Sequence, residues 1–159
     1  MTLATWQTLP LAFLVGVALF LGGRVQTSLM LGAALLALGW FFAWRGRELG
    51  RAILPGVAAG VVPLALALAA QAYGHVCTGS GCMSLCVPAC SFGGAVAGFL
   101  VAYAARASTA RGRTIAASSA LALLVGSLGC SCVGYGGVVG LGVGLAATLV
   151  PTALVLRRA

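Results

Sequence analysis

The sequence predicts an all-α integral membrane protein, a bundle of six transmembrane helices with both termini in the cytoplasm. The first observation is that 62% of the 159 residues are hydrophobic and only 6% are charged, where soluble domains carry about 25%. The second is that all nine basic residues are arginine and Glu48 is the single acid. The third is a succession of six uncharged apolar segments close to the roughly 20 residues that a membrane helix needs. So few charges cannot cover a water-exposed surface, which excludes an ordinary cytosolic enzyme, a disordered chain and a nucleic-acid-binding module.

The six predicted spans lie between arginines and polar clusters, and together they form a single transmembrane domain over residues 1–159. They cover residues 6–23, 28–44, 52–73, 88–105, 114–129 and 133–156. The first span is not a signal peptide, because no positive segment precedes it and no small-residue cleavage pattern follows. The fifth span is short for a full crossing, so we expect it to tilt or to extend into the neighbouring loop.

The arginines predict the orientation of the bundle. Cytoplasmic loops are enriched in basic residues, and six spans place all but one arginine on a single side. These are Arg45, Arg47, Arg51, Arg106, Arg111, Arg113, Arg157 and Arg158, with only Arg24 opposite. Five or seven spans would scatter them over both sides. The lipid bilayer is therefore an expected partner. The expected location is the bacterial inner (cytoplasmic) membrane.

Glycines recur every four residues in three of the spans, a spacing that lets helix backbones approach closely. They are Gly56, Gly60, Gly94, Gly98, Gly136, Gly140 and Gly144. Packing within the bundle is the main interpretation, and association with further copies or with other membrane subunits is the alternative. The sixth span carries the longest strip, so we expect it to be the central helix.

All six cysteines lie outside the cytoplasm in this topology. Four belong to an outer loop over residues 74–90, and two lie in the turn between the fifth and sixth spans. They are Cys77, Cys82, Cys86, Cys90, Cys130 and Cys132. The arginines predict the topology without any use of the cysteines, so their grouping on one side is an independent signal. All six are candidates for disulfide bonds, which suit an even count of cysteines on the oxidising side of a membrane.

Two other interpretations of the cysteines stay open. A soft metal ion, such as copper, zinc or a mercury-like ion, prefers thiolate ligands. Its candidate ligands are Cys82, Cys86, Cys90, Cys130, Cys132 and His75. A reversible dithiol is the third interpretation, because Cys130-Ser-Cys132 could form a strained, reducible bridge. Pro88 fits best as the first residue of the fourth span, so Cys82 and Cys86 are expected in a loop and only Cys90 in a helix.

The predicted spans contain no acidic, basic or histidine residue, which is informative about function. Proton relays and ion-coupled carriers rely on such groups inside the bundle. Hard cations such as calcium need anionic oxygen ligands, and the outer side has no acid at all. The same absence leaves no Ser–His–acid set, so no catalytic residue is expected. The cysteine thiols are therefore the one remaining group of side chains with a plausible chemical function.

The segment Cys86-Val-Pro-Ala-Cys90, followed by a glycine-rich span, resembles membrane anti-sigma regulators of the NrsF type. Those proteins have a longer cytoplasmic segment before their first span, and the short basic loops here offer little surface for a large cytoplasmic partner. Cysteines at the outer end of a glycine-rich helix are also similar to small mercuric-ion transport proteins, which have fewer spans and an adjacent cysteine pair. Neither resemblance assigns a role to any residue.

The expected function is non-enzymatic, with outer cysteines that handle or sense soft metal ions or oxidants. One alternative is a small transporter that uses a thiol relay. A second is a structural subunit of a membrane complex with disulfide-stapled outer loops. A third is an anti-sigma-type membrane regulator. Nucleic acid is not an expected partner.

Overall fold

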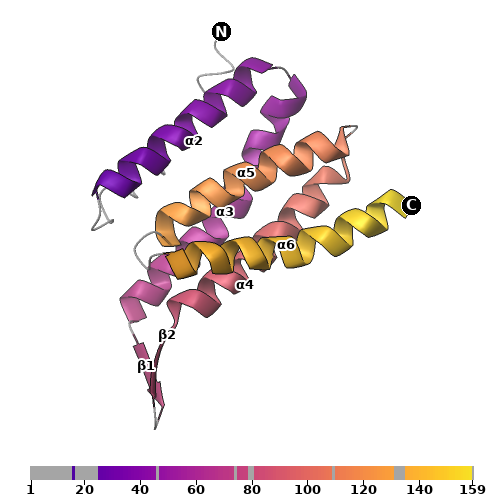
Figure 1. The fold of residues 1–159 in the computed structure, drawn as a ribbon. Helices are drawn as coiled ribbons and strands as arrows, with labels where there is room; N and C mark the ends of the chain where they lie inside the picture. Colours follow the sequence, from indigo (N-terminus) through magenta and orange to yellow (C-terminus); the bar gives the residue numbers. More distant parts are fainter. Residues whose placement is uncertain are drawn as a thin grey trace.

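The computed structural model describes residues 16, 25–45, 47–73, 75–78, 81–108, 110–130 and 135–158. Within these residues the chain forms helices joined by short connections and one small hairpin (Figure 1). The elements are α2 (Val25–Arg45), α3 (Arg47–Tyr73), β1 (His75–Thr78), β2 (Gly81–Ser84), α4 (Cys86–Ala105), α5 (Arg111–Cys130) and α6 (Tyr135–Arg158). The predicted helical class is confirmed. The first predicted span, apart from residue 16, lies outside the described residues, and so does the count of six.

Four of the described helices are long and apolar enough to cross a membrane. Their apolar stretches are Ala52–Ala70, Cys86–Ala105, Arg111–Gly129 and Gly136–Val155. The apolar stretch of α2, Leu29–Arg45, is shorter. Helix α5 extends beyond the predicted span 114–129 at both ends, which gives it the length that a crossing needs. These helices indicate a multi-pass membrane protein.

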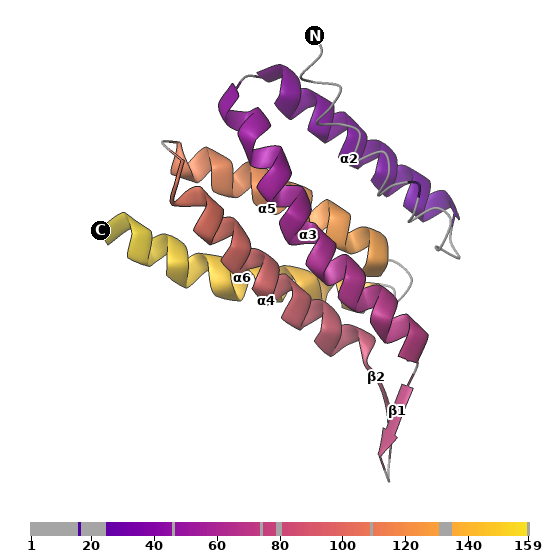
Figure 2. The ribbon, with the colours of Figure 1, turned by 180° about the vertical axis from the view of Figure 1, so that it is seen from behind.

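Helices α3 and α5 form the middle of the bundle, with α2 on one side of them and α4 and α6 on the other. Helix α3 lies against α5 and α4, α4 lies against α6, and α2 covers the outer side of α3 and α5 (Figures 1 and 2). One apolar cluster joins α2, α3 and α5, and a second joins α3, α4, α5 and α6. The first consists of Leu35, Ile53, Val57, Leu64, Leu121, Val125 and Leu128. The second consists of Ala59, Ala97, Val101, Ala102, Ala122, Leu145 and Leu149.

The prediction that the sixth span is the central helix is wrong. Only 22% of the apolar window of α6 is buried, against 56% for that of α5. The glycine strip of α6 lies against one neighbour, α4, and the opposite face is open. Val139 and Val143, for example, are each 62% exposed. Helices α3 and α5 occupy the centre instead.

All of the predicted glycines except Gly136 lie where two helices approach closely, and a β-carbon at Gly136 would meet only the Val87 side chain at 3.9 Å. A β-carbon at Gly56 would stand 2.9 Å from the Ser118 Cα atom, so α3 and α5 meet there backbone to backbone. A β-carbon at Gly144 would overlap the Ser91 carbonyl oxygen, and one at Gly94 would overlap the Leu141 carbonyl oxygen. Glycine therefore sets the spacing of the α3–α5 and α4–α6 pairs.

Pro63 also depends on glycine neighbours. Its ring is fully buried inside α3, and a β-carbon at Gly93 of α4 would stand 2.7 Å from its Cα atom. On the other side, a β-carbon at Gly126 of α5 would stand 3.0 Å from its Cγ atom. Small residues on both neighbours thus make room for a proline within a continuous helix.

The predicted outer loop over residues 74–90 is largely regular structure. Strands β1 and β2 pair antiparallel between residues 75 and 84. Helix α4 begins at Cys86, so the expectation that Cys86 lies in a loop is wrong, as is the expectation for Cys82, which lies in β2. The first four N–H groups of a helix have no partner within it. Pro88 therefore fits the third position of the first turn without loss of a hydrogen bond.

Candidate functional site

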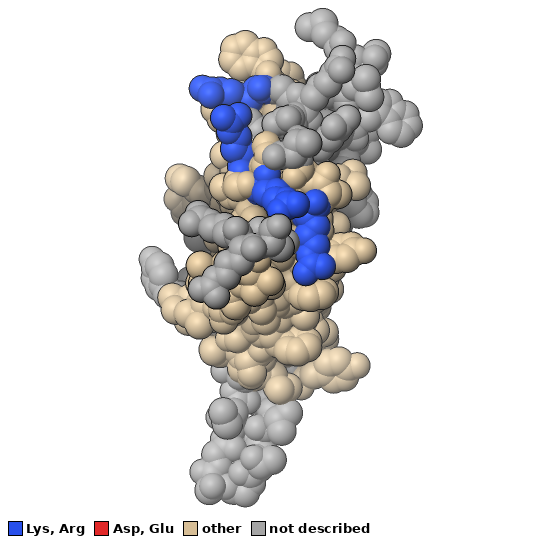
Figure 3. Space-filling view, turned by 90° about the vertical axis from the view of Figure 1, so that its right-hand side faces the viewer, with Lys and Arg blue, Asp and Glu red and all other residues tan. Residues whose placement is uncertain are grey.

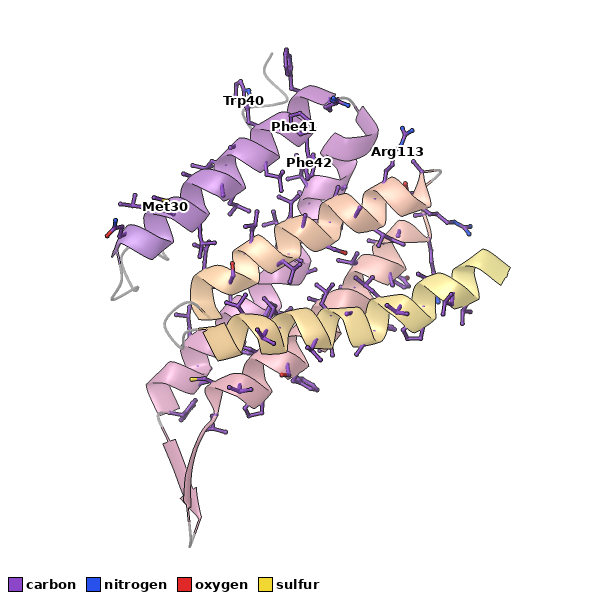
Figure 4. All side chains as sticks on the ribbon, in the orientation of Figure 1. Met30, Trp40, Phe41, Phe42 and Arg113 are labelled. Carbon is purple, nitrogen blue, oxygen red and sulfur yellow. The ribbon has the colours of Figure 1, made fainter. Side chains whose placement is uncertain are left out.

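The described arginines and the described cysteines lie at opposite ends of the bundle. We call the hairpin, the first turn of α4 and the last turn of α5 the cysteine end. The end of α2, the start of α3 and the connection from α4 to α5 form the arginine end. Figure 3 shows the described arginines gathered in one half of the molecule, and Arg113 projects from the start of α5, away from the hairpin (Figure 4). The segregation of these two residue types is a property of the fold.

Two cysteines on α4 stand in different chemical states. Cys86 is a free thiol and is partly exposed. Cys90 takes part in a disulfide bond and is fully buried. Residues four apart on a helix have β-carbons about 5–6 Å apart on one face. A free thiol therefore lies one helical turn from a disulfide.

Cys90 lies where the transmembrane helices converge. It packs with Ala67 of α3 and Leu141 of α6 in a small apolar cluster. A β-carbon at Gly129 of α5 would stand 3.1 Å from the Ala67 β-carbon, so the last turn of α5 reaches the same place. Gly129 directly precedes Cys130, the last residue of α5. The backbone of Cys130 therefore lies next to this neighbourhood.

The hairpin brings two further cysteines together along the backbone. The strands pair in the register His75↔Ser84, Val76↔Met83, Cys77↔Cys82 and Thr78↔Gly81. Cys77 and Cys82 are thus direct partners across the ladder. The sequence carried the signal for this hairpin, because two short segments flank Gly79-Ser80, and such a pair of residues is typical of a hairpin connection.

The soft-metal prediction stays a prediction. Among the described residues there is no group of three or more His, Cys, Asp or Glu side chains that could hold a metal ion. Only Cys86 and Cys90 of the candidate ligands have described side chains. Those of His75, Cys82 and Cys130 lie outside the description, and Cys132 lies outside it entirely.

Polar groups within the described spans serve helix packing. The Ser118 hydroxyl of α5 donates a buried hydrogen bond of 3.0 Å to the Ala52 carbonyl oxygen of α3. Ser127 and Thr148 donate to carbonyl oxygens of their own helices. The Ser119 hydroxyl is buried and has no hydrogen-bond partner among the described residues. The sequence alone does not distinguish the bonded serine from the unbonded one.

The arginine end is held by weaker contacts. Arg45, Arg106, Arg111 and Arg113 are all exposed. The Arg45 guanidinium lies 5.2 Å from the centre of the Phe41 ring. The hydroxyls of Ser108 and Thr114 are 2.7 Å apart and share a hydrogen bond across the α4–α5 connection. The side chains of Arg47, Glu48 and Arg51 lie outside the description.

The arrangement at the cysteine end is suited to thiol–disulfide chemistry. It combines a free thiol, a buried disulfide one turn away and two cysteines opposed on a hairpin. Acid–base groups are scarce there, since His75 is the only titratable residue other than cysteine and tyrosine between residues 52 and 105. The chain matches no known protein family, no curated protein and no solved structure.

Proposed function

We propose that this chain is a multi-pass protein of the bacterial inner membrane whose extracytoplasmic cysteines sense oxidants by thiol–disulfide exchange, without catalysing a reaction of their own. One observation carries the proposal. Cys86 is a partly exposed free thiol, and Cys90, four residues further along the same helix, is buried in a disulfide.

The orientation follows from the separation of the two ends. Basic residues accumulate on the cytoplasmic side of membrane proteins, and the arginine end carries exposed guanidinium groups on three segments. The cysteine end then faces the extracytoplasmic space, where disulfides form and persist. This placement supports a role for the cysteines in responding to the oxidising compartment.

The oxidant acts before the exchange: a small-molecule disulfide takes two electrons from the thiols of Cys90 and its partner cysteine, is released as two small thiols and leaves the disulfide that Cys86 then attacks. The Cys86 thiol loses its proton, and its sulfur attacks the Cys90 sulfur. A Cys86–Cys90 bond forms, the existing bond of Cys90 breaks, and the released cysteine takes up a proton. Residues four apart on a helix have Cα atoms about 6 Å apart, within the range of about 4.4–6.8 Å that disulfides tolerate. Their β-carbons are about 5–6 Å apart in a regular helix and must come within about 4.5 Å, so the new bond requires the first turn of α4 to distort. The number of disulfides stays constant. The disulfide that joins Cys90 to a cysteine outside α4 is replaced by the Cys86–Cys90 disulfide, which lies within α4.

The state of Cys90 favours oxidants over soft metals as the signal. A soft metal ion binds thiolates, and a sulfur in a disulfide is not a thiolate. With Cys90 oxidised, the helical pair Cys86 and Cys90 offers one thiolate, and a metal site needs several. An oxidant sensor instead requires a thiol and a disulfide within reach of each other, which is what α4 presents.

The test is a redox titration in native membranes followed by trapping. Membranes are equilibrated with different ratios of reduced to oxidised glutathione, free thiols are alkylated, and disulfide-linked peptides are mapped. We expect a Cys86–Cys90 linkage to appear over part of the titration in the wild-type protein. Cys86→Ser should abolish it and leave Cys90 in its original bond.

A matched control is Val87→Thr, which keeps the side-chain volume on the next residue of the same turn and should leave the linkage intact. The proposal is overturned if Cys86 enters no disulfide with Cys90 at any glutathione ratio. It is also overturned if Cys90 loses its original bond in the Cys86→Ser protein at the same glutathione ratios as in the wild type.

A further inference from the structure

The hairpin over residues 75–84 carries a second pair of cysteines, apart from those on α4. Cys77 of β1 and Cys82 of β2 are direct partners in the antiparallel register. The hairpin backbone extends beyond the ends of the helices (Figures 1 and 2). A slip of the register by one residue would set Cys77 against Gly81 or Met83, so the pairing is a specific feature of this register.

Backbone geometry places these two residues within disulfide range. Directly opposed residues of an antiparallel ladder have Cα atoms about 4.5 or 5.5 Å apart, depending on the kind of pair. Disulfides need Cα atoms about 4.4–6.8 Å apart, which either kind satisfies, and β-carbons about 3.5–4.5 Å apart, which the non-hydrogen-bonded kind approaches more closely. Opposed residues also lie on the same face of the ladder, with β-carbons about 4.5–5.5 Å apart.

We propose that Cys77 and Cys82 form a cross-strand dithiol–disulfide pair that reacts with small-molecule disulfides outside the membrane. In the oxidation, one cysteine thiolate attacks a sulfur of the small disulfide and releases one small thiol. The second cysteine then attacks the mixed disulfide, forms the Cys77–Cys82 bond and releases the second small thiol. Two electrons pass from the cysteines to the small disulfide, and the two cysteine protons appear on the released thiols.

The pairing also assigns the remaining sulfurs by elimination. Cys86 is free and Cys90 is bonded. If Cys77 forms a disulfide with Cys82, the partner of Cys90 is Cys130 or Cys132. This agrees with the contact of the last turn of α5 with the cluster around Cys90. The oxidised chain then holds two disulfides and two free thiols, one of them Cys86.

Oxidation of the pair is expected to order the hairpin. Two strands of four residues each are marginal as an isolated unit in water. A cross-strand bond constrains the unfolded chain and so favours the paired state. An oxidising extracytoplasmic thiol pool would thereby increase the population of the paired hairpin in the segment that connects α3 to α4.

The experiment uses the full-length protein in native membranes and two alkylating labels. Free thiols take the first label, the sample is reduced, and newly released thiols take the second. Chymotrypsin cleavage after Tyr73 and Leu85 isolates a peptide of residues 74–85, which contains only Cys77 and Cys82. We expect both to carry the second label in oxidised membranes and to change label together across a glutathione titration.

Single substitutions test whether the two cysteines protect each other. Cys77→Ser should move Cys82 entirely to the first label, and Cys82→Ser should do the same for Cys77. Ser84→Ala, on the same strand, is the control and should leave both protected. Protection of Cys82 that survives Cys77→Ser would overturn the inference, and so would separate titration of the two thiols in the wild-type protein, which needs no variant.

The outcome is separable from that of the proposed function. In the Cys86→Ser protein the Cys77–Cys82 pair should titrate unchanged, because it does not use Cys86. Absence of the Cys86–Cys90 linkage with an intact hairpin pair would overturn the proposed function alone. An intact linkage with independently reacting hairpin thiols would overturn this inference alone.

Discussion

The two ends of the bundle are stabilised by different physics, although the same helices run through both. The cysteine end combines a buried disulfide sulfur and a paired hairpin, whereas close backbone contacts at glycine occur along the length of the bundle. The arginine end has exposed guanidinium groups, a cation–π contact and a shared hydroxyl hydrogen bond. Exposed charges contribute little to stability, whereas covalent links and tight packing contribute much. Substitutions should therefore destabilise the protein most at the cysteine end and least at the arginine end.

The largest expected effect is at Cys90. Replacing it with Ala removes a disulfide, and loss of a native disulfide typically costs about 2–5 kcal/mol. The free energy of unfolding in mild detergent should fall by an amount in that range. Cys86→Ser removes a free, partly exposed thiol from the same helix and should change stability by less than about 0.5 kcal/mol. An equal fall in the free energy of unfolding for the two variants would contradict the claim that the Cys90 disulfide stabilises the cysteine end.

The next effect is expected at the contact between α4 and α6. Gly144→Ala places a β-carbon against the Ser91 carbonyl oxygen, and such overpacking costs about 1–3 kcal/mol. Gly142→Ala is the matched control on the same helix, since nothing lies within 4 Å of its β-carbon position. It should be neutral or stabilising, because Ala exceeds Gly in helix propensity by about 1 kcal/mol. Thermal unfolding in detergent should rank Gly142→Ala above the wild type and Gly144→Ala below it.

A smaller effect is expected at the serine pair on α5. Ser118→Ala removes the hydrogen bond to the Ala52 carbonyl oxygen, and interhelical hydrogen bonds in membranes contribute about 0.6–1.7 kcal/mol. Ser119→Ala removes a buried hydroxyl that has no partner among the described residues, so its loss should be neutral or stabilising. The two variants have the same composition, and the same unfolding measurement compares them. Equal destabilisation would show that this hydrogen bond contributes nothing.

The smallest effect is expected at the arginine end. Arg113 is exposed at the start of α5, and an exposed charge away from special contacts changes stability within about 0.5 kcal/mol. Arg113→Gln should therefore unfold at the wild-type midpoint. A loss above about 1 kcal/mol would mean that the arginine end is a stabilised structure and that the gradient along the bundle does not exist.

Much of the fold could be predicted from the sequence, because hydropathy and arginine placement report directly on membrane insertion. The position of α6 could not. A glycine strip predicts that one face of a helix approaches another helix, but it says nothing about the other faces. Lipid is as apolar as a helix interface, so Val139 and Val143 would look the same in the sequence whether they faced lipid or protein.

The candidate site was predictable only in outline. The grouping of six cysteines predicted where the chemistry lies, but six cysteines allow fifteen complete pairings, and spacing alone does not choose among them. The register of Cys77 with Cys82 and the helical start at Cys86 narrow the choice. Pro88 predicts a later start for α4, because a proline disfavours helical geometry at the preceding residue, Val87. The first turn of a helix nevertheless tolerates proline, and α4 begins at Cys86.

The most direct test of the central claim is labelling with a membrane-impermeant thiol reagent in vesicles of both orientations, before and after reduction. We predict that Cys86 reacts without reduction in right-side-out vesicles and is protected in inside-out vesicles. Cys90 should react only after reduction. Labelling of Cys86 solely in inside-out vesicles, or of Cys90 before reduction, would contradict the claim that the cysteine end is an extracytoplasmic thiol–disulfide site.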